Sequence, residues 1–300
     1  MKFRVALLLA AVLVLLCGIA MAEKVTYRGL TFDTSDEVVD IGTMSIGASQ
    51  WKEYYAFLEK FPNLKHVVMW KAYTYRVHID YLTEHWPDVQ FDCTLWFGDG
   101  HHVRTDQTAF STLHGTTSAV HNADEISIVK YCKKLKGLDF GHNGVADISF
   151  LYELPNLRVL ICAINRITDI TPIGSLKKLE YLELFTNYVT DLSPLVGLTH
   201  LIDLNIGYNL ITDLRPLTKM PWLKRVWMYR ATDRYTEGIL PERQQKWLKR
   251  KLPNTTFDFG SNPCQGGWRI ETGDAHYPVI NKMFRGGYYI PFADSYPDDD

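Results

Sequence analysis

The 300-residue sequence lacks the features that mark several large classes of protein. Lys and Arg total 32 against 34 Asp and Glu, so it has no basic excess of the kind that nucleic-acid binding requires. It contains no Gly-x-Ser-x-Gly nucleophile motif, no His-Glu-x-x-His zinc motif and no phosphate-binding loop. We therefore expect no enzyme activity, no cofactor, no metal site and no nucleic-acid partner.

Long apolar runs are also missing, and the clearest short one opens the chain. Residues 5–16 are apolar, follow Lys2 and Arg4, and precede Ala20-Met21-Ala22, the small-x-small pattern that signal peptidase accepts. A run of about a dozen residues is short of the roughly 20 needed to cross a bilayer. The pattern predicts a signal peptide over residues 1–22 and a secreted or extracellular protein with no membrane span after cleavage. Two alternatives stay open, an uncleaved anchor and a lipid-anchored surface protein modified at Cys17.

Against these absences stands a 22-residue pattern that repeats across residues 135–230. Self-similarity at a fixed period between about 20 and 29 residues is the signature of a leucine-rich-repeat solenoid. Three residue types recur at this step: Leu135, Leu157, Leu179, Leu201 and Leu223; Asn143, Asn165, Asn187 and Asn209; Asp147, Asp169, Asp191 and Asp213.

Each repeat is expected to contain a strand, a turn and a short outer helix. In residues 157–162, strand alternation places Leu160 and Cys162 in the core and their neighbours on the concave face. The repeated Asn follows where the strand turns, and we expect the four amides to form a hydrogen-bonded ladder with the backbone. In Thr171-Pro172 and Ser193-Pro194, a hydroxyl at the N-cap and Pro at the first helical position predict a short helix or 3₁₀ turn on the convex side.

Residues 135–230 resemble the 22-residue bacterial leucine-rich repeat of the internalin type. The resemblance rests on phrases such as Leu-Glu-Tyr-Leu-Glu-Leu-Phe-Thr-Asn-Tyr-Val-Thr-Asp at residues 179–191 and Leu-Ser-Pro-Leu at residues 192–195. The leader, the helical N-terminal units, Arg104-Thr105-Asp106 and Gly266-Gly267-Trp268-Arg269 also resemble exported leucine-rich-repeat proteins of gut Firmicutes, whose function is undefined. The resemblance implies an α/β solenoid and carries no activity over to this chain.

Longer, helical units are expected before the regular array. The spacing of Trp51, Tyr54, Tyr55, Leu58 and Phe61 predicts one amphipathic helix, and an Asp-Gly pair between alternating runs predicts a hairpin. In order, the sequence predicts a strand over 38–41, a helix over 50–61, a strand over 64–69, a helix over 77–85, a strand over 89–93 and a hairpin over 94–106.

The array is expected to end in a capping unit and an aromatic tail. A helix over 241–252 and a strand over 256–259 would shield the last repeat. The tail is too aromatic to be wholly disordered, and we expect much of it to pack along the solenoid. The predicted regions are a signal peptide (1–22), helical units with the hairpin (23–106), the repeat array with its capping helix (107–260) and the tail (261–300).

Four cysteines follow the leader, and the repeat pattern argues against disulfides for two of them. An even number in an exported chain suggests disulfides. However, Cys132 and Cys162 occupy positions that hydrophobic residues hold in the other repeats, which predicts buried free thiols. Cys93 and Cys264 are expected on opposite sides of the solenoid, too distant to pair unless the tail folds back.

The concave face is the first candidate for a binding site. Binding hot spots favour aromatic and Arg side chains, and these gather toward the C-terminal strands. The alternative is that the side chains serve cross-strand pairing or are covered by the tail. The predicted binding residues are Tyr181, Glu183, Phe185, Asp203, Asn205, Tyr208, Arg225, Trp227, Tyr229 and Arg230.

The leading hypothesis is an exported, non-enzymatic scaffold that binds a protein or peptide ligand, or acts in adhesion, through the concave face. One alternative is a glycan or cell-wall hydrolase with a site between the hairpin and the tail. Another is a purely structural envelope component, favoured if residues 261–297 fill the concave face. Asp99, His101, His102 and Asp106 could ligate zinc, but adjacent strand residues point to opposite faces, so we interpret them as hairpin residues.

Overall fold

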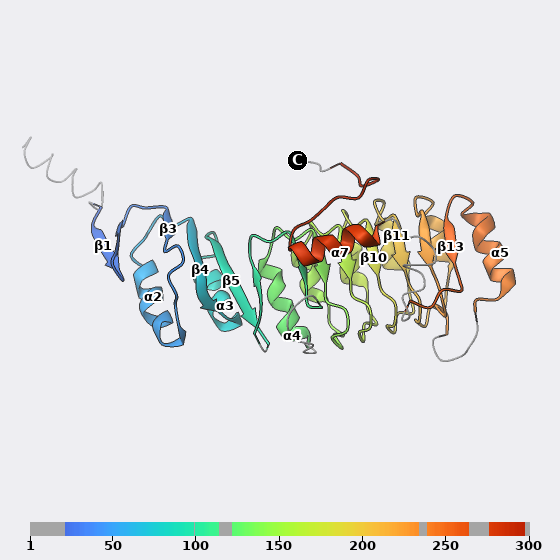
Figure 1. Ribbon diagram of the computed structural model, residues 1–300, viewed down its shortest axis with the longest axis horizontal. Helices are drawn as coiled ribbons and strands as arrows, with labels where there is room; N and C mark the ends of the chain where they lie inside the picture. The colour runs from blue at the N-terminus through green and yellow to red at the C-terminus, as the bar shows by residue number, and fades with distance from the viewer. Residues whose placement is uncertain (1–21, 99, 114–121, 234–238, 264–275, 298–300) are drawn as a thin grey trace, which may run out of the picture. The chain divides into compact units, whose positions relative to one another are not determined.

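The computed structural model describes residues 22–98, 100–113, 122–233, 239–263 and 276–297 (Figure 1). The predicted signal peptide, apart from Ala22, lies outside these residues. Within the described ranges, no helix is both long enough and apolar enough to cross a membrane. The chain divides into two compact units, one comprising residues up to Tyr73 with Tyr81–Asp92, the other Thr74–Asp80 with residues from Cys93 onward. The hairpin therefore falls in the second unit.

The first unit contains a hairpin and a pair of parallel strands. β1 (Lys24–Tyr27) and β2 (Leu30–Asp33) pair antiparallel around Arg28 and Gly29, whose φ angles of 48° and 91° are those that a tight hairpin turn requires. β3 (Val38–Asp40), expected from the sequence, pairs in parallel with β4 (His66–Thr74). The β1–β2 hairpin is not expected from the sequence, because each of its strands alternates over only four residues.

The predicted amphipathic helix of the first unit is confirmed. A 3₁₀ turn, η1 (Ala48–Gln50), leads into α2 (Trp51–Leu58), whose buried face is made of Trp51, Tyr54, Phe57 and Leu58. The rings of Tyr27 and Phe57 stack with their centroids 4.7 Å apart. The helix therefore packs on the β1–β2 hairpin through an aromatic core.

The next helix and the hairpin also form where the sequence predicts them. α3 spans Arg76–His85, and β5 (Gln90–Phe97) extends beyond the predicted strand. β5 pairs antiparallel with β6 (His101–Arg104), with Leu95 opposite Val103. The Thr105 hydroxyl oxygen accepts a hydrogen bond from the Cys93 N–H at 3.0 Å, which ties the end of the hairpin to its own strand.

The repeat array forms one seven-stranded sheet in which all strands are parallel (Figure 1). From β8 to β12 paired residues lie one 22-residue repeat apart, as in Leu160 opposite Leu182 and Leu182 opposite Leu204. The first strand is unexpected, because Ala109 pairs with Gly137 outside the 22-residue step. The strands in order are β7 (Ala109–Ser111), β8 (Gly137–Asp139), β9 (Val159–Ile161), β10 (Tyr181–Glu183), β11 (Asp203–Asn205), β12 (Arg225–Trp227) and β13 (Thr256–Asp258).

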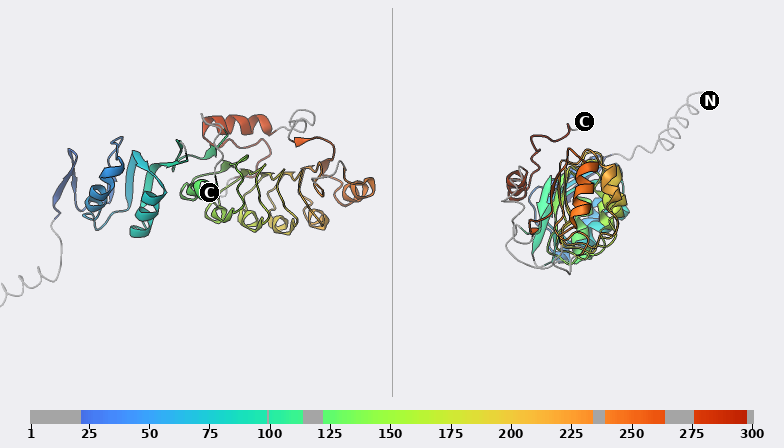
Figure 2. Two further views of the ribbon diagram at one scale, coloured as in Figure 1. Left: turned by 90° about the horizontal axis from the view of Figure 1, so that it is seen from below. Right: turned by 90° about the vertical axis from the view of Figure 1, so that its right-hand side faces the viewer.

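Short 3₁₀ turns form the convex side, opposite the sheet (Figure 2). The expectation of a hydroxyl N-cap is wrong: the Asp169 carboxylate accepts from the N–H of Thr171 at 2.8 Å and also from its hydroxyl. The Thr171 hydroxyl therefore donates to the Asp169 carboxylate, and the carboxylate caps the backbone N–H. Both hydrogen bonds lower the pKa of Asp169. The convex elements are α4 (Ala123–Ile126), η2 (Ser127–Tyr131), η3 (Ser149–Glu153), η4 (Thr171–Ser175), η5 (Ser193–Gly197) and η6 (Arg215–Lys219).

The repeated asparagines form a ladder of hydrogen bonds inside the array. The Asn187 side chain donates to the carbonyls of Leu184 and Cys162 at 2.9 and 3.0 Å, and its oxygen accepts from the Ile167 N–H at 3.0 Å. Asn165 and Asn209 repeat these contacts one repeat away. Each amide thus satisfies backbone groups of two repeats that would otherwise be buried without partners.

The predicted capping unit and the predicted packing of the tail are present. α5 (Glu242–Lys251) precedes β13, which pairs with β12. After Pro263 the described chain resumes at His276 and forms α7 (Tyr277–Gly286). Cys93, Cys132 and Cys162 are buried free thiols, and burial raises the pKa of Cys132 and Cys162. Cys264 lies outside the described residues.

Candidate functional site

Most of the predicted binding residues lie on the concave face and are buried. Six of the ten are at most 3% exposed: Tyr181, Glu183, Phe185, Asp203, Asn205 and Trp227. The other four are half-buried: Tyr208, Arg225, Tyr229 and Arg230. The tail packs on Tyr181, Phe185 and Trp227 and contacts Asp203, which agrees with the alternative that the tail covers part of this face. A role in binding stays a prediction for all ten.

The tail covers the concave face with an apolar layer. Figure 2 shows α7 on the side of the sheet opposite the 3₁₀ turns. Ile280, Met283 and Phe284 of α7, joined by Phe292, form one buried cluster with the concave side chains of the sheet. The approach is close at Gly137, because a Cβ there would lie 2.8 Å from the Met283 sulfur and the methionine side chain would have to shift. Residues on the sheet side of this cluster are Ala109, Val159, Ile161, Ala163, Tyr181, Phe185 and Trp227.

A buried ion pair holds the last described residues of the tail. Arg158 and Glu180, 4% and 0% exposed, form an ion pair of 2.7 Å. Glu180 Oε1 accepts from the Tyr296 N–H at 3.0 Å, and Arg158 Nη1 donates to the Tyr296 carbonyl at 2.8 Å. The Ser295 hydroxyl donates to Glu180 Oε2 at 2.7 Å. We call this arrangement the Glu180–Arg158 clamp, because it binds both backbone groups of one tail residue.

A second polar contact joins the start of α7 to the sheet and to the tail. His276 Nδ1 lies 2.6 Å from Asp203 Oδ2, and its Nε2 lies 2.6 Å from Asp294 Oδ1. Arg225 Nε donates to Asp203 at 2.5 Å, and Lys224 donates to Asp294 at 2.8 Å. We call this set the His276 latch.

The latch shifts the titration of its members. Burial alone would lower the pKa of His276, but the hydrogen bond and charge of Asp203, helped by Asp294, outweigh it and raise that pKa. Burial would likewise raise the pKa of Asp294, yet hydrogen bonds from Lys224 and His276 lower it to about 2. The charged forms of both groups are therefore favoured in the docked tail.

Sequence reasoning did not identify the clamp or the latch. Arg158 and Glu180 have opposite charges at the same position of adjacent repeats. This spacing places them side by side, so the ion pair could have been predicted from the sequence. His276 and Asp294 lie outside the periodic region, and nothing in their spacing indicates which strand they contact. Their burial depends on where α7 docks, which the repeat pattern does not determine.

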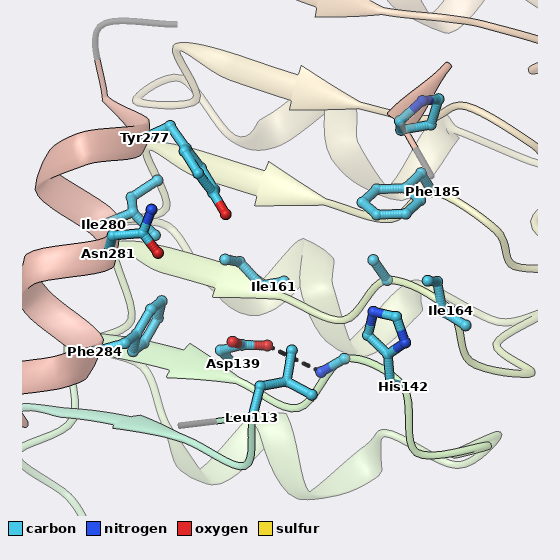
Figure 3. A pocket seen from close by; sticks show the side chains of 13 residues that line it. Leu113, Asp139, His142, Ile161, Ile164, Phe185, Tyr277, Ile280, Asn281 and Phe284 are labelled. Carbon is cyan, nitrogen blue, oxygen red and sulfur yellow. Dashed lines mark hydrogen bonds between the residues drawn. The ribbon is translucent and has the colours of Figure 1, made fainter. Parts of the chain in front are cut away.

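A cavity of about 190 Å³ lies between α7 and the C-terminal ends of the strands (Figure 3). Tyr277 and Asn281 of α7 point toward the strands, whereas His142 and Ile164 lie at the opposite side. Asp139 borders the cavity and accepts from the Gly141 N–H at 3.0 Å and the Ser111 hydroxyl at 2.8 Å. The cavity is smaller than the 300–1,000 Å³ typical of drug-sized ligands, so it suits one side chain. Its apolar lining is Leu113, Ile161, Ala163, Ile164, Phe185, Ile280 and Phe284.

The C-terminal ends of five successive strands carry a row of residues in the left-handed backbone conformation. Their φ angles lie between 49° and 63°. Each is half-buried or exposed, and apart from Tyr229, which is half-buried, the residues on either side of them are buried. Glycine or asparagine is the usual choice for this conformation, yet neither occurs in the row. We call these residues the rim: His142, Ile164, Thr186, Tyr208 and Arg230.

The last rim residues form an aromatic and cationic cluster. The rings of Tyr208 and Tyr229 meet edge to face with centroids 5.2 Å apart. The Arg230 guanidinium lies over both rings, 5.5 and 5.3 Å from their centroids. Its Nε is buried and has no hydrogen-bond partner among the residues that the structure describes. An Arg held by aromatic rings is suited to bind a carboxylate.

No group of three or more His, Cys, Asp or Glu side chains among the described residues could hold a metal ion. His101 is buried and His102 exposed on adjacent positions of β6, as the hairpin interpretation requires. Asp99 lies outside the described residues. Asp203 of the sheet and Asp294 of the tail both contact His276.

Comparisons with known proteins agree with the repeat geometry. Residues 155–197 match the family described as leucine-rich repeats (2 copies). No curated protein matches the sequence. One similar solved structure is an internalin (InlF) of Listeria monocytogenes, at 19% identity over 75% of this chain and 54% of that chain, with a TM-score of 0.43.

Two further solved structures are similar at the same level. Internalin C2 of Listeria monocytogenes is 21% identical over 71% of this chain and 84% of its own, with a TM-score of 0.35. A leucine-rich-repeat protein of Leptospira interrogans is 20% identical over 67% and 50%, with a TM-score of 0.44. The chain thus spans about half the length of two of these three proteins. The family match and the repeated unit of strand, Asn turn and 3₁₀ turn together make this chain a leucine-rich-repeat protein in fold.

Proposed function

We propose that this protein is an exported, non-enzymatic scaffold that binds a protein or peptide partner along the rim. Leucine-rich-repeat scaffolds are typically used for protein binding, and the leader composition supports export. The tail occupies the middle of the concave face, and the rim follows the C-terminal edge of the same strands. A partner lying along this edge would cross five repeats and meet a different side chain in each one.

The observation that carries the proposal is the retained backbone strain of the rim. A non-glycine residue in the left-handed region costs about 1–2 kcal/mol, and Ile164 and Thr186 are β-branched, for which the conformation is a true outlier. Strain of this kind is concentrated at functional sites. Five residues in this conformation occur at equivalent positions of successive repeats, and the last of them, Arg230, lies over two tyrosine rings. This supports a surface in which the strain is retained because the side chains take part in binding.

The chemistry of the rim favours a partner segment with apolar and acidic groups. His142 and Ile164 border the 190 Å³ cavity, which can take one apolar side chain. At the other end of the row, Arg230 is placed to bind a carboxylate. We therefore expect an extended segment with an apolar anchor and, farther along, an Asp, a Glu or a terminal carboxylate.

A phage-displayed random peptide library tests this function. The wild-type protein, an Arg230→Glu variant and an Arg215→Glu variant would be used for selection in parallel. Arg215 lies on the convex turn η6 and its side chain is 79% exposed. Arg215→Glu is therefore a control that makes the same charge change at a position away from the rim. We expect the wild type and Arg215→Glu to enrich the same acidic peptides and Arg230→Glu to lose them. Equal enrichment by all three proteins would refute the rim as the binding surface.

A second function, a structural envelope component, is supported by one observation. The tail fills the concave face where a partner would be expected, and Phe292 lies in the buried cluster with the sheet. In that case the library would give no enrichment with the wild type. The hydrolase hypothesis has less support, because the converging carboxylates Asp203 and Asp294 are buried or half-buried and contact His276.

A further inference from the structure

The Glu180–Arg158 clamp recognises peptide backbone. Glu180 accepts the N–H of Tyr296 while Arg158 donates to the carbonyl of the same residue, at 3.0 and 2.8 Å. Arg158 Nη2 also donates to the next carbonyl, of Pro297, at 3.3 Å. Two tail side chains also contact the clamp: the Ser295 hydroxyl donates to Glu180 Oε2 at 2.7 Å, and the Tyr289 hydroxyl donates to the same oxygen at 3.4 Å. This pattern would hold any extended segment with a hydroxyl residue followed by a residue with a free N–H.

Stability alone does not explain the clamp. Both side chains are almost completely buried, and replacing a buried ion pair with well-packed apolar residues is often neutral or stabilising. The neighbouring part of the same interface is apolar, formed by α7 and Phe292. An apolar pair at positions 158 and 180 would extend that layer but could not bind backbone groups. The presence of a charged pair at positions 158 and 180 therefore indicates recognition of a peptide backbone.

Residues 295–297 make few buried contacts apart from these bonds, whereas Asp294 before them is held by the His276 latch. Residues 293–297 are exposed or half-buried, in contrast to Phe292. The Tyr296 ring packs on His200, with centroids 4.3 Å apart, and remains 38% exposed. Segments with few buried apolar contacts open at a small fraction of the global unfolding free energy. Residues 295–297 can therefore leave the clamp while Asp294 stays in the latch and α7 stays docked.

We propose that the Glu180–Arg158 clamp is a binding site for an extended peptide of a partner protein, and that residues 295–297 occupy it as an internal substitute. The partner segment would carry Ser or Thr followed by an aromatic residue, which reproduces the contacts of Ser295 and Tyr296. This inference rests on the proposed function, because it assumes that the ligand is a protein or peptide. The clamp lies at the N-terminal ends of β9 and β10, opposite the rim, so the two sites can fail separately.

The test uses the full chain and a fluorescent peptide with the sequence of residues 288–297. In a Tyr296→Pro variant the tail loses the N–H that Glu180 accepts, which weakens its hold on the clamp. A tethered segment competes at an effective concentration of about millimolar. We therefore expect the peptide to bind Tyr296→Pro at least tenfold more tightly than wild type, measured by fluorescence anisotropy.

Two controls make the test specific to the clamp. A peptide N-methylated at its first position after Ser keeps every side chain but lacks the N–H, and should bind Tyr296→Pro at least tenfold more weakly. Adding Arg158→Met and Glu180→Leu to Tyr296→Pro replaces the ion pair with apolar residues and should abolish binding, with circular dichroism confirming the fold.

Three results would overturn the proposal. The first is equal affinity of wild type and Tyr296→Pro for the peptide, and the second is equal affinity of the two peptides for the variant. The third is a wild-type dimer in sedimentation velocity that the peptide dissociates, because the occupant would then be the tail of a second copy. The peptide-library selection on Arg230→Glu reports on the rim independently of these outcomes.

Discussion

His276 and Asp203 lie 73 residues apart in the sequence, yet Nδ1 of the histidine is 2.6 Å from the carboxylate of the aspartate. The other ring nitrogen faces Asp294 at the same distance. Only the protonated imidazole can donate from both nitrogens at once. Docking of the tail on the sheet is therefore linked to the charge of one histidine.

Tail docking should depend on pH in a direction set by the latch. The raised pKa of His276 stabilises docking below its ordinary value of 6.5, and this stabilisation is lost as pH rises through the raised value. The lowered pKa of Asp294 stabilises docking above 3.8 and is lost as pH falls toward 2. Arg225 and Lys224 also face these groups. Docking should be firmest between about pH 4 and 6.5.

Hydrogen exchange of the α7 amides measures this dependence. After correction for intrinsic rates, we expect lower protection at pH 8.5 than at pH 5.5 in the wild type. A His276→Gln variant should lose most of this difference, whereas His85→Gln, at an exposed position of α3, should retain it. Equal protection of wild-type α7 at both pH values would show that the latch does not control docking.

Loss of one ladder amide should destabilise the array. Asn187→Ala removes the side-chain hydrogen bonds to Leu184, Cys162 and Phe185 and the one from Ile167. It leaves buried backbone groups of two repeats without partners, at a cost of about 2–4 kcal/mol in the free energy of unfolding. Asn156→Ala, at a half-buried position outside the ladder, should change it by less than about 0.5 kcal/mol. Urea unfolding measures both, and similar values for the two variants would contradict the role of the ladder.

Relief of strain in the rim should stabilise the fold and weaken binding. Ile164 has a φ of 54°, so Ile164→Asn should raise the free energy of unfolding by about 1 kcal/mol. The same change at Ile239, which is 52% exposed and lies outside the rim, should have little effect. Thermal unfolding and the peptide-library selection measure the two consequences. A lower melting temperature, or unchanged enrichment, would contradict the interpretation of the rim.

The repeat geometry could be predicted from the sequence because it is periodic. Leu182 lies inward and pairs with Leu160 and Leu204, as the 22-residue step requires, and Asn187 bonds at the predicted turn. The β1–β2 hairpin and β7 have no periodic signal and were outside that prediction. Aromatic composition also indicated that the tail packs on the solenoid.

The residue-level site could not be predicted in the same way. The concave position of Tyr181 follows from its repeat phase, but its 1% exposure follows from where α7 and Phe292 dock. That docking is decided by contacts between a periodic and a non-periodic region, such as His276 with Asp203. For the same reason, Tyr181→Ala and Trp227→Ala would disturb the docked tail and would not report cleanly on a partner.

The central claim is that the tail of this protein covers its own concave face. Hydroxyl-radical footprinting with mass spectrometry measures the exposure of individual side chains and tests it directly. Tyr181 and Phe185 are 1% and 3% exposed, whereas Tyr152 and Tyr288 are 52% and 50% exposed and act as internal references. The account predicts that Tyr181 and Phe185 are protected at pH 5.5 while both references are oxidised. Oxidation of Tyr181 at the rate of Tyr152 would contradict it.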